Sequence, residues 1–382
     1  MVAPTNEAEL ADVIAASKQA FSIKGGGTRT LGTTMGIPME TQALTGVELY
    51  DPGALTVVAK AGTSLDDLHS ILAADHQRLA FEPPDLRALL GRDGLSTIGG
   101  VVAANASGPR RIQGGACRDY LLGVRFVDGT GRIVKNGGRV MKNVTGYDLV
   151  KLMAGSHGTL GVLSEVSLKV LPIPEQVGVL LIEGLRPDQA VSAMSMALGS
   201  PFDVTGAAHT TKGLDGDPVT MIRLEGFENS VRYRAEALRD KLIEFGDIHI
   251  ETDAVKTAAG WAWVRDAAMH VGLPGDVWRI SVAPKDGPVV AALLPDTEIQ
   301  FDWGGGLLWA RVPDGFDVRA ALTGLKGHAT RIKGAGTPQD PSVFAPESAP
   351  VAALTAGIRK QFDPKGLLNP GLMGAAPSRK EQ

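Results

Sequence analysis

Glycine is the residue that most constrains how this chain folds, because 48 of its 382 residues are glycine and the usual share is only about 7%. The glycines gather in two stretches, residues 25–36 and residues 91–161, and the second stretch holds 16 of them. Without a Cβ, glycine reaches positive φ and lets a ligand approach the backbone closely. No G-X-Y period indicates collagen, and an apolar share of 44% argues against disorder. Both stretches are therefore candidates for backbone that packs against a bound molecule.

Charge and cysteine content exclude several classes of protein. The net charge of −4 provides no attraction for nucleic acid or for an anionic lipid surface, so we expect no nucleic-acid partner. A single cysteine, Cys117, can form neither an intrachain disulfide nor a cysteine-based zinc or iron–sulfur site within this chain. The seven histidines are scattered without an H-E-x-x-H pattern, and G-x-S-x-G is absent. We therefore expect no metal site and no acyl-transfer chemistry.

No segment of the sequence is typical of a secretion signal or of a membrane span. The N-terminus carries Glu7, Glu9 and Asp12 where a signal peptide would carry positive charge and an apolar run. The longest uncharged stretch near the middle, residues 95–109, is 15 residues long and includes polar side chains, so it is too short to cross a bilayer. We expect a cytoplasmic protein without a membrane span, in which any contact with the inner membrane goes through a partner.

Helix and strand signals alternate in the first part of the chain. The patterns predict a helix from Thr5 or Asn6 to Gln19, a helix after Ser64, strands at 21–24, 55–61 and 163–171, and a hairpin at 121–134 around Asp128-Gly129. Apart from these strands, residues 91–161 look poor in helix and rich in turns. Pro172 and Pro174 follow the last strand and indicate a domain boundary.

The second part of the chain predicts an α+β layer, with helices on one face of a mostly antiparallel sheet. The expected helices are 186–198, 229–246 with Asn229 or Ser230 as its cap, and 349–362, and the expected strands are 178–185, 220–227, 278–284, 288–294, 298–303 and 307–312. Residues 376–382 resemble a frayed terminus. We divide the chain into residues 1–173, residues 174–340 and a C-terminal segment, residues 341–382.

The first glycine-rich loop is a candidate anion site. Three glycines lie between Lys24 and Thr28-Arg29, directly after a predicted strand. Successive glycine amides can converge on an anion such as a pyrophosphate. Neither the P-loop pattern nor G-x-G-x-x-G is met here, and a flexible surface turn is the alternative interpretation.

Two further segments of small residues could line a ligand. Residues 96–108 would let a large flat ligand lie against the backbone, or would form a buried helix of small residues. Residues 142–149 and 154–163 form a third cluster, in which Gly161 and Val162 enter a strand. His157 in this cluster could act as a general base, although we favour a turn histidine that faces solvent.

The order and spacing of eight segments resemble the FAD-binding domain of the vanillyl-alcohol-oxidase superfamily, also called the PCMH type. The segments are IKGGGTR, AGTSLDDL, FEPPD, STIGGVVAANASG, RDYLLGVRFVDGTGRIV, KNVTGYDL, GTLGVLSEVSLKVLP and DPKGLLNPG. Within that superfamily, residues 277–284, 301–310 and 327–330 and the short total length are similar to the family of FAD-binding subunits E of glycolate oxidase, also called glycolate dehydrogenase. The resemblance implies an α+β protein: a PCMH-type domain of two α/β subdomains, a second α+β domain, and a C-terminal segment that returns to the first domain.

The resemblance also implies which residues hold FAD. The implied cofactor-binding residues are Lys24, Gly25, Gly26, Gly27, Thr28, Arg29, Pro84, Asp85, Thr97, Ile98, Gly99, Gly100, Ala103, Asn105, Ser107, Gly108, Gly158, Gly161, Val162 and Asn369. Gly25 to Thr28 would cradle the pyrophosphate, and Asn369 would return to the flavin from the C-terminus. Covalently flavinylated relatives place a histidine in or just after the first glycine loop. Thr28 and Arg29 occupy those positions here, so we expect non-covalent FAD.

The implied activity is the oxidation of glycolate to glyoxylate by a complex that also contains a sister FAD subunit and an iron–sulfur subunit. Relatives that oxidise D-2-hydroxy acids carry an H-x-G-D-G-N run, whereas residues 327–336 contain only His328. The chain would then relay electrons or support its sister subunit. The alternatives are a self-sufficient FAD oxidase or dehydrogenase for another small hydroxy acid or alcohol, and a flavin-fold scaffold without catalytic activity.

Three residues are candidates for contact with a substrate, and the catalytic base is left unassigned. Arg279 or Arg311 could bind a substrate carboxylate in a bidentate manner, although an exposed strand arginine is the more common situation. His328 is the third candidate. Trp303 and Trp309 could wall a flavin pocket or belong to the core.

Overall fold

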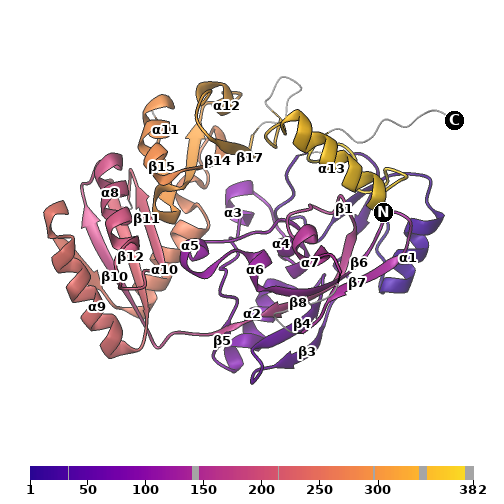
Figure 1. Cartoon of the computed structure of the whole chain (residues 1–382), viewed down its shortest axis with the longest axis horizontal. Helices are drawn as coiled ribbons and strands as arrows, with labels where there is room; N and C mark the ends of the chain where they lie inside the picture. Colours follow the sequence, from indigo (N-terminus) through magenta and orange to yellow (C-terminus); the bar gives the residue numbers. More distant parts are fainter. Residues whose placement is uncertain (33, 140–145, 214, 296, 335–341, 375–382) are drawn as a thin grey trace.

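The chain folds into two lobes joined by an extended connection, as a computed structural model shows (Figure 1). The structure describes residues 1–374 except 33, 140–145, 214, 296 and 335–341, so the predicted frayed end at 376–382 lies outside it, as do residues 142–145 of the third glycine cluster. The first lobe contains a five-stranded sheet and the second an eight-stranded sheet. Both sheets are antiparallel throughout, which confirms the predicted α+β class.

The first lobe has the sheet order β3-β4-β8-β6-β7. Its strands are β1 (Phe21–Lys24), β2 (Ile37–Glu40), β3 (Val47–Asp51), β4 (Thr56–Lys60), β5 (Gln77–Arg78), β6 (Leu121–Val127), β7 (Ile133–Gly137), β8 (Val162–Lys169) and β9 (Leu171–Pro172). Its helices are α1 (Glu7–Ala16), α2 (Leu65–Ala74), α3 (Arg87–Leu90), α4 (Ile98–Ala103), α5 (Arg111–Gly114), α6 (Cys117–Tyr120) and α7 (Leu149–Met153). Strands β1 and β2 form a separate parallel pair beside the main sheet.

Local signals position these elements much as predicted. The side chain of Asn6 accepts a hydrogen bond from the Glu9 amide, and that of Ser64 accepts one from the Asp67 amide, so both predicted helix caps are confirmed. Strands β6 and β7 form the predicted hairpin. The expectation that residues 91–161 are poor in helix is wrong in part, because four short helices, α4 to α7, lie there. Each is four to six residues long, too short to produce a periodic apolar pattern in sequence.

The second lobe is built on a sheet with the order β13-β10-β12-β11-β15-β16-β14-β17. Its strands are β10 (Gln176–Glu183), β11 (Gly206–Thr210), β12 (Val219–Gly226), β13 (Ile248–Glu251), β14 (Asp276–Val282), β15 (Ile299–Asp302), β16 (Leu307–Val312) and β17 (Gly327–Lys333). Its helices are α8 (Pro187–Leu198), α9 (Glu228–Lys241), α10 (Ala254–Arg265), α11 (Gly287–Leu293) and α12 (Val318–Ala321), with single 3₁₀ turns at Ile243–Phe245, Ala268–His270, Pro284–Asp286 and Trp303–Gly305.

Three predictions for this lobe are wrong. Helices cover both faces of the sheet, because α8 and α9 pack on the face that carries Leu180 and Ile222, whereas Trp261 of α10 packs with Met221 on the other face. Residues 288–294 lie in helix α11 and the Leu294 cap, since a proline in the first turn suits a helix. Helix α9 begins before Asn229 and Ser230, with Phe227 at its cap position and no side-chain cap.

The C-terminal segment returns to the first lobe. Helix α13 (Ala349–Phe362) occupies the predicted residues 349–362, and it lies over the first lobe (Figure 1). The rings of Phe362 and Phe126 are 6.1 Å apart, and Leu368 packs with Phe21 in a shared apolar cluster. Strands up to Pro172 lie in the first lobe and strands from Gln176 lie in the eight-stranded sheet. We therefore propose residues 1–173, 174–340 and 341–382 as the functional divisions. Among the described residues, no helix is both long and apolar enough to span a membrane.

A buried network of ion pairs joins the two lobes. Arg223 of β12 donates two hydrogen bonds of 2.9 Å to the carboxylate of Glu82, and Arg78 of β5 donates two of 3.1 and 3.0 Å to Glu225 of β12. Arg110 also contacts Glu225. Burial alone would raise the pKa of Glu82, but the hydrogen bonds and charge of Arg223, together with the charges of Arg110 and Arg78, hold the pKa below its usual value. The network therefore holds the two lobes in one relative position.

We expect Glu82→Gln to destabilise the protein by about 3–5 kcal/mol, because Arg223, Arg78 and Arg110 would then share the single buried carboxylate of Glu225. The measurement is the midpoint of chemical denaturation. The matched control is Asp188→Asn, which removes the partner of Arg186 in an exposed ion pair and should leave the midpoint unchanged. Equal midpoints for the two variants would contradict the structural role of the network.

Candidate functional site

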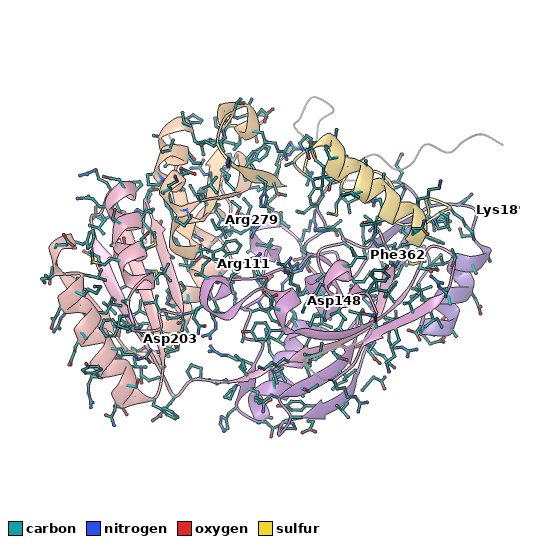
Figure 2. The ribbon with its side chains drawn as sticks, viewed as in Figure 1. Lys18, Arg111, Asp148, Asp203, Arg279 and Phe362 are labelled. Carbon is teal, nitrogen blue, oxygen red and sulfur yellow. The ribbon has the colours of Figure 1, made fainter. Side chains whose placement is uncertain are left out.

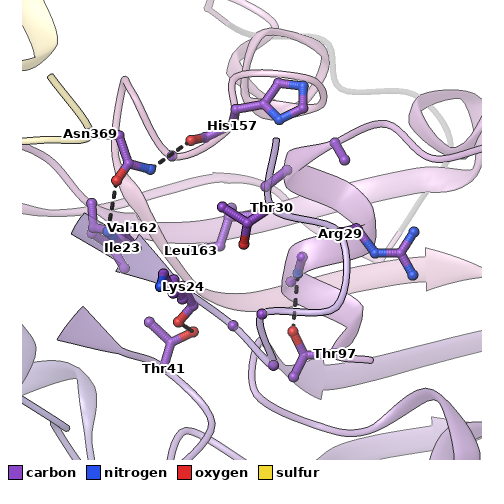
Figure 3. Close-up of a pocket in the computed structure, with 18 of the residues that line it drawn as sticks. Ile23, Lys24, Arg29, Thr30, Thr41, Thr97, His157, Val162, Leu163 and Asn369 are labelled. Atoms are coloured by element: carbon purple, nitrogen blue, oxygen red, sulfur yellow. Dashed lines mark hydrogen bonds between the residues drawn. The ribbon is translucent and has the colours of Figure 1, made fainter. Parts of the chain in front are cut away.

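A cleft opens where strand β1 ends, and we call it the glycine cleft (Figure 3). It encloses about 800 Å³, including space open to solvent. The residues that line it are Ile23, Lys24, Gly25, Gly26, Gly27, Thr28, Arg29, Thr30, Leu31, Thr34, Thr41, Ala61, Thr97, Gly99, Gly100, Ala103, Ala104, His157, Gly158, Gly161, Val162, Leu163, Asn369 and Leu372. Most of the predicted cofactor residues are therefore gathered around one cleft, although they come from four separate segments of the chain.

The loop from Gly25 to Thr28 needs glycine for steric reasons. A Cβ on Gly26 would lie 1.6 Å from the carbonyl oxygen of Leu95, and a Cβ on Gly25 would lie 2.3 Å from the hydroxyl oxygen of Thr97. Gly27 has a φ of +70°, in the left-handed region. Within the described part of the chain, no group accepts a hydrogen bond from the amides of Gly26, Gly27 or Thr28. These amides are therefore available to an anionic ligand or to water, in a loop that packs closely against Leu95 and Thr97.

Helix α4 forms the second wall of the cleft. Thr97 caps this helix by accepting a hydrogen bond from the Gly100 amide (3.3 Å). A Cβ on Gly99 would lie 2.7 Å from Ala61, so the helix approaches the end of β4 as closely as backbone allows. Residues 96–108 therefore contain the helix of small residues that was one interpretation of this segment, and the same helix lines the cleft.

Asn369 closes the cleft from the C-terminal segment. Its side-chain oxygen accepts a hydrogen bond of 2.7 Å from the Ile23 amide, and its side-chain nitrogen donates one of 2.9 Å to the His157 carbonyl oxygen (Figure 3). One side chain thus ties together β1, the turn that precedes β8 and the end of the chain. Gly161 in that turn is required because a Cβ would lie 2.5 Å from the ring of Phe126.

A second cavity of about 1090 Å³ adjoins the first, and we call it the arginine cavity. The two share Arg29, Leu31, Ala104 and His157. The residues that line the arginine cavity are Arg29, Leu31, Pro84, Leu86, Ala104, Asn105, Ala106, Ser107, Arg111, Gly155, His157, Arg279, Ser281, Trp303, Trp309, His328, Thr330, Ile332 and Phe344. Its walls come from both lobes, with β14, β16 and β17 facing the segment from Asn105 to Arg111.

Three arginines line the arginine cavity, Arg29, Arg111 and Arg279, and the last two share one tryptophan ring. The guanidinium carbons of Arg111 and Arg279 each lie 4.9 Å from the ring centroid of Trp303, and Figure 2 shows both residues where the lobes meet. Neither side chain forms a hydrogen bond or ion pair with any residue in the described ranges. No carboxylate lines the cavity in this part of the chain. Burial lowers the pKa of Arg279 to about 10, so the group remains cationic at neutral pH.

The two predicted strand arginines have different surroundings. Arg279 lies in the arginine cavity, whereas Arg311 pairs with Glu298 at 3.5 Å and lines neither cavity. Trp303 and Trp309 are buried, and both also line the arginine cavity. His328 lies at the cavity, and its pKa is lowered by burial and then by the charges of Arg279 and Arg111.

His157 lines both cavities and is half-buried, so it differs from the solvent-facing turn histidine that we favoured. Its ring contacts Phe344 edge-on, with centroids 5.1 Å apart, and its φ of +49° lies in the left-handed region. Burial lowers the pKa of His157 to about 4. The imidazole is therefore neutral and a weak base at physiological pH.

Several predicted cofactor residues lie away from the glycine cleft. Pro84, Asn105 and Ser107 line the arginine cavity instead. The residues that line neither cavity are Asp85, whose carboxylate binds Arg87, Ile98, which is buried in the core of the first lobe, and Gly108, whose carbonyl oxygen accepts a hydrogen bond from Trp303.

The sequence reasoning missed Arg111 and Thr41. Arg111 lies three residues after the 96–108 segment, so its position close to a predicted ligand-binding segment was the available signal in the sequence. Thr41 donates a hydrogen bond to the Lys24 carbonyl oxygen, and no sequence motif around Thr41 indicates this contact. Among the described residues, no cluster of three or more His, Cys, Asp or Glu side chains could hold a metal ion.

Comparisons with known proteins identify the family. A family model described as "FAD binding domain" matches residues 1–137. The chain is 35% identical to the glycolate oxidase subunit GlcE of Escherichia coli K12 over 342 residues, which cover 89% of this chain and 88% of that protein. It is 32% identical to the glycolate oxidase subunit GlcD of Bacillus subtilis over 202 residues, which cover 51% of this chain and 42% of that protein.

Solved structures agree with this family at the level of the fold. A 4-ethylphenol oxidase from Gulosibacter chungangensis aligns with a TM-score of 0.71 at 13% identity, covering 99% of this chain and 89% of that one. An alkyldihydroxyacetonephosphate synthase aligns with a TM-score of 0.69 at 16% identity, covering 97% and 77%. The glycine cleft, the match to an FAD-binding domain and the near full-length similarity lead to one conclusion. The chain belongs to the GlcE family of FAD-dependent oxidoreductases.

Proposed function

We propose that this chain is the FAD-binding subunit of a complex that oxidises glycolate to glyoxylate, with a sister FAD subunit and an iron–sulfur subunit as its partners. Its similarity to subunits that are named for glycolate oxidase supports this role. We also propose that glycolate binds in the arginine cavity of this chain. The observation that carries this second step is the pair of arginines without a carboxylate partner, Arg111 and Arg279, in a cavity that adjoins the glycine cleft. An electron relay or a scaffold would not need such a pair.

The glycine cleft fits FAD. The amides of Gly26, Gly27 and Thr28 have no acceptor within the described structure, and any Cβ on Gly26 would obstruct the loop. We propose that these amides hold the pyrophosphate of FAD and that Gly99, Gly100 and Asn369 contact the rest of the FAD molecule. When bound, FAD supplies a two-electron acceptor for the oxidation of the alcohol carbon. Thr28 and Arg29 offer no histidine for a covalent link, which supports non-covalent binding.

The arginine cavity offers a complete set of contacts for a small hydroxy acid. The planar guanidinium group of Arg279 can donate two parallel hydrogen bonds to a carboxylate. Arg111 adds a second positive charge on the same tryptophan ring, and no acidic side chain in the described lining competes for either arginine. Trp303 and Trp309 exclude water from the walls, which strengthens these charge interactions.

His328 is the best placed candidate base in this cavity. Its pKa is lowered by burial and by the nearby charges of Arg279 and Arg111, so the imidazole is neutral at physiological pH. A neutral imidazole can accept the hydroxyl proton of glycolate. The position of His328 at the partly exposed start of β17 would then allow the proton to leave to solvent.

The test of the proposed function is the visible spectrum of the purified, FAD-loaded chain after glycolate is added without oxygen. We expect the absorption band of oxidised flavin to disappear. In the variant Arg279→Gln, the glycolate concentration needed for half of this effect should rise roughly 10- to 100-fold, because a charged hydrogen-bond pair contributes about 1.5–3 kcal/mol.

The control for this test is Arg311→Gln, which removes a strand arginine outside both cavities and should leave the glycolate dependence unchanged. Persistence of the flavin band in the isolated chain, with bleaching only after the sister subunit is added, would contradict substrate binding by this chain. Such a result would favour the alternative in which this chain relays electrons and its sister subunit binds glycolate.

We expect Gly26→Ala to reduce the affinity for FAD by roughly tenfold or more, because the new methyl group would collide with the Leu95 carbonyl oxygen and displace the loop. The measurement is the dissociation constant from flavin fluorescence. Gly357→Ala is the control, since its Cβ would meet no atom within 4 Å and glycine disfavours a helix such as α13. Unchanged FAD affinity in Gly26→Ala would contradict the proposal that this loop holds the pyrophosphate of FAD.

Acid precipitation of the purified, FAD-loaded protein should release the flavin into the supernatant, because neither Thr28 nor Arg29 can form the histidyl link of covalent relatives. The measurement is the partition of yellow colour and flavin fluorescence between the pellet and the supernatant. Flavin that stays in the washed pellet would show a covalent attachment elsewhere.

A further inference from the structure

A groove on the second lobe lies apart from both cavities, and none of its residues lines either of them. It encloses about 1560 Å³, including space open to solvent. The lining residues are Val179, Leu181, Glu183, Gly213, Asp215, Asp217, Val219, Met221, Glu251, Lys256, Thr257, Ala259, Gly260 and Trp263. They belong to strands β10, β12 and β13, to helix α10 and to the loop after β11. We call it the sheet groove.

The floor of the sheet groove is apolar because α10 covers only part of this sheet face. Leu181 of β10 lies opposite Met221 of β12, so the two side chains are on the same face. Trp261 and Val264 of α10 bury the neighbouring part of that face. Leu181, Val219 and Trp263 keep partial exposure and pack around the same cluster. This face of the sheet therefore retains apolar surface that the residues described by the structure do not cover.

The rim of the sheet groove is acidic. It contains the four carboxylates Glu183, Asp215, Asp217 and Glu251. Lys256 is the one cationic side chain in the described lining, and it pairs with Glu251 at 3.2 Å. None of the other three carboxylates forms an ion pair within the described residues. The groove therefore combines an apolar floor with uncompensated negative charge.

We propose that the sheet groove is the docking site for a segment of a partner protein that carries large apolar side chains flanked by Lys or Arg. Apolar side chains would bury the exposed part of Leu181, Val219 and Trp263, and basic side chains would meet the three unpaired carboxylates. The same carboxylates repel phosphate, so nucleic acid and anionic lipid do not fit. The proposal does not depend on FAD or on glycolate, because the groove shares no residue with their cavities.

A photo-crosslinking amino acid placed at Ala259 tests this surface in the full-length chain inside the cells that produce it. Ala259 is exposed and lines the groove, so p-benzoylphenylalanine there should link to the docked segment. The same probe at Tyr233, which is exposed on α9 across the sheet, is the control. We expect mass spectrometry to identify one peptide, specific to the Ala259 probe, with apolar residues flanked by Lys or Arg.

Charge reversal decides whether the captured peptide occupies the groove. The double substitution Asp215→Lys and Asp217→Lys should reduce the yield of the cross-link roughly tenfold, and Lys or Arg to Glu changes in the peptide should restore it. The milder pair Asp215→Asn and Asp217→Asn should give an intermediate yield and covers the case in which the reversal variant folds poorly. Asp240→Lys on α9 is the charge-matched control and should leave the yield unchanged.

Flavin content and the unfolding midpoint are measured for every variant, so loss of capture is separated from loss of the fold. Three results would each overturn the proposal: equal capture at Ala259 and Tyr233, a captured peptide without basic residues or from this chain itself, and no restoration by reciprocal charge reversal. A negative result here would leave the spectral test with glycolate unaffected, because that test addresses other residues.

Discussion

The crossed ion pairs between the lobes are the interaction on which the rest of the structure depends. Arg223 reaches from the second lobe to Glu82 of the first, and Arg78 reaches from the first lobe to Glu225 of the second. Charges this deeply buried cost desolvation energy unless each keeps its partner, so the pairs tolerate only one alignment of the two sheets. That alignment brings β14 and β17 against the segment after α4, which is where the arginine cavity forms. The position of the cavity therefore follows from contacts that lie outside it.

Backbone and side chains have separate roles on the two sides of this site. The glycine cleft presents amides and close backbone contacts around Gly26 and Gly99, which suit a large ligand of fixed shape. The arginine cavity presents cationic side chains on an aromatic surface, Trp303, which suits a small anion. Asn369 and His157 lie at the boundary, and their hydrogen bond holds the wall of the cleft in place. Under the proposed function, neighbouring cavities of different chemistry would thus retain the cofactor and exchange the substrate.

Sequence patterns located the glycine-rich walls of the cleft, because a requirement for glycine is visible in the residues themselves. Asn369 came only from the family resemblance, since its partner Ile23 lies 346 residues away. Sequence patterns could not separate Arg279 from Arg311. Strand β14 is buried on both faces, as Val277 and Trp278 show. Apolar and polar residues therefore do not alternate along it, and the sequence does not indicate which face carries Arg279. Helix α10 went unpredicted because its apolar residues do not gather on one side. The pairing of Glu82 with Arg223, 141 residues apart, has no local signal at all.

Trp303 shows why the two lobes cannot be exchanged independently. Its ring supports Arg279 of its own lobe and Arg111 of the other, and its indole nitrogen donates a hydrogen bond of 3.0 Å to the Gly108 carbonyl oxygen across the junction. A chimera that grafts this FAD-binding lobe onto a foreign second lobe would keep the dinucleotide cradle and lose the anion pocket. Under the proposed function, substrate preference in this chain would be a property of the junction, and a change of specificity would require matched substitutions on both sides of it.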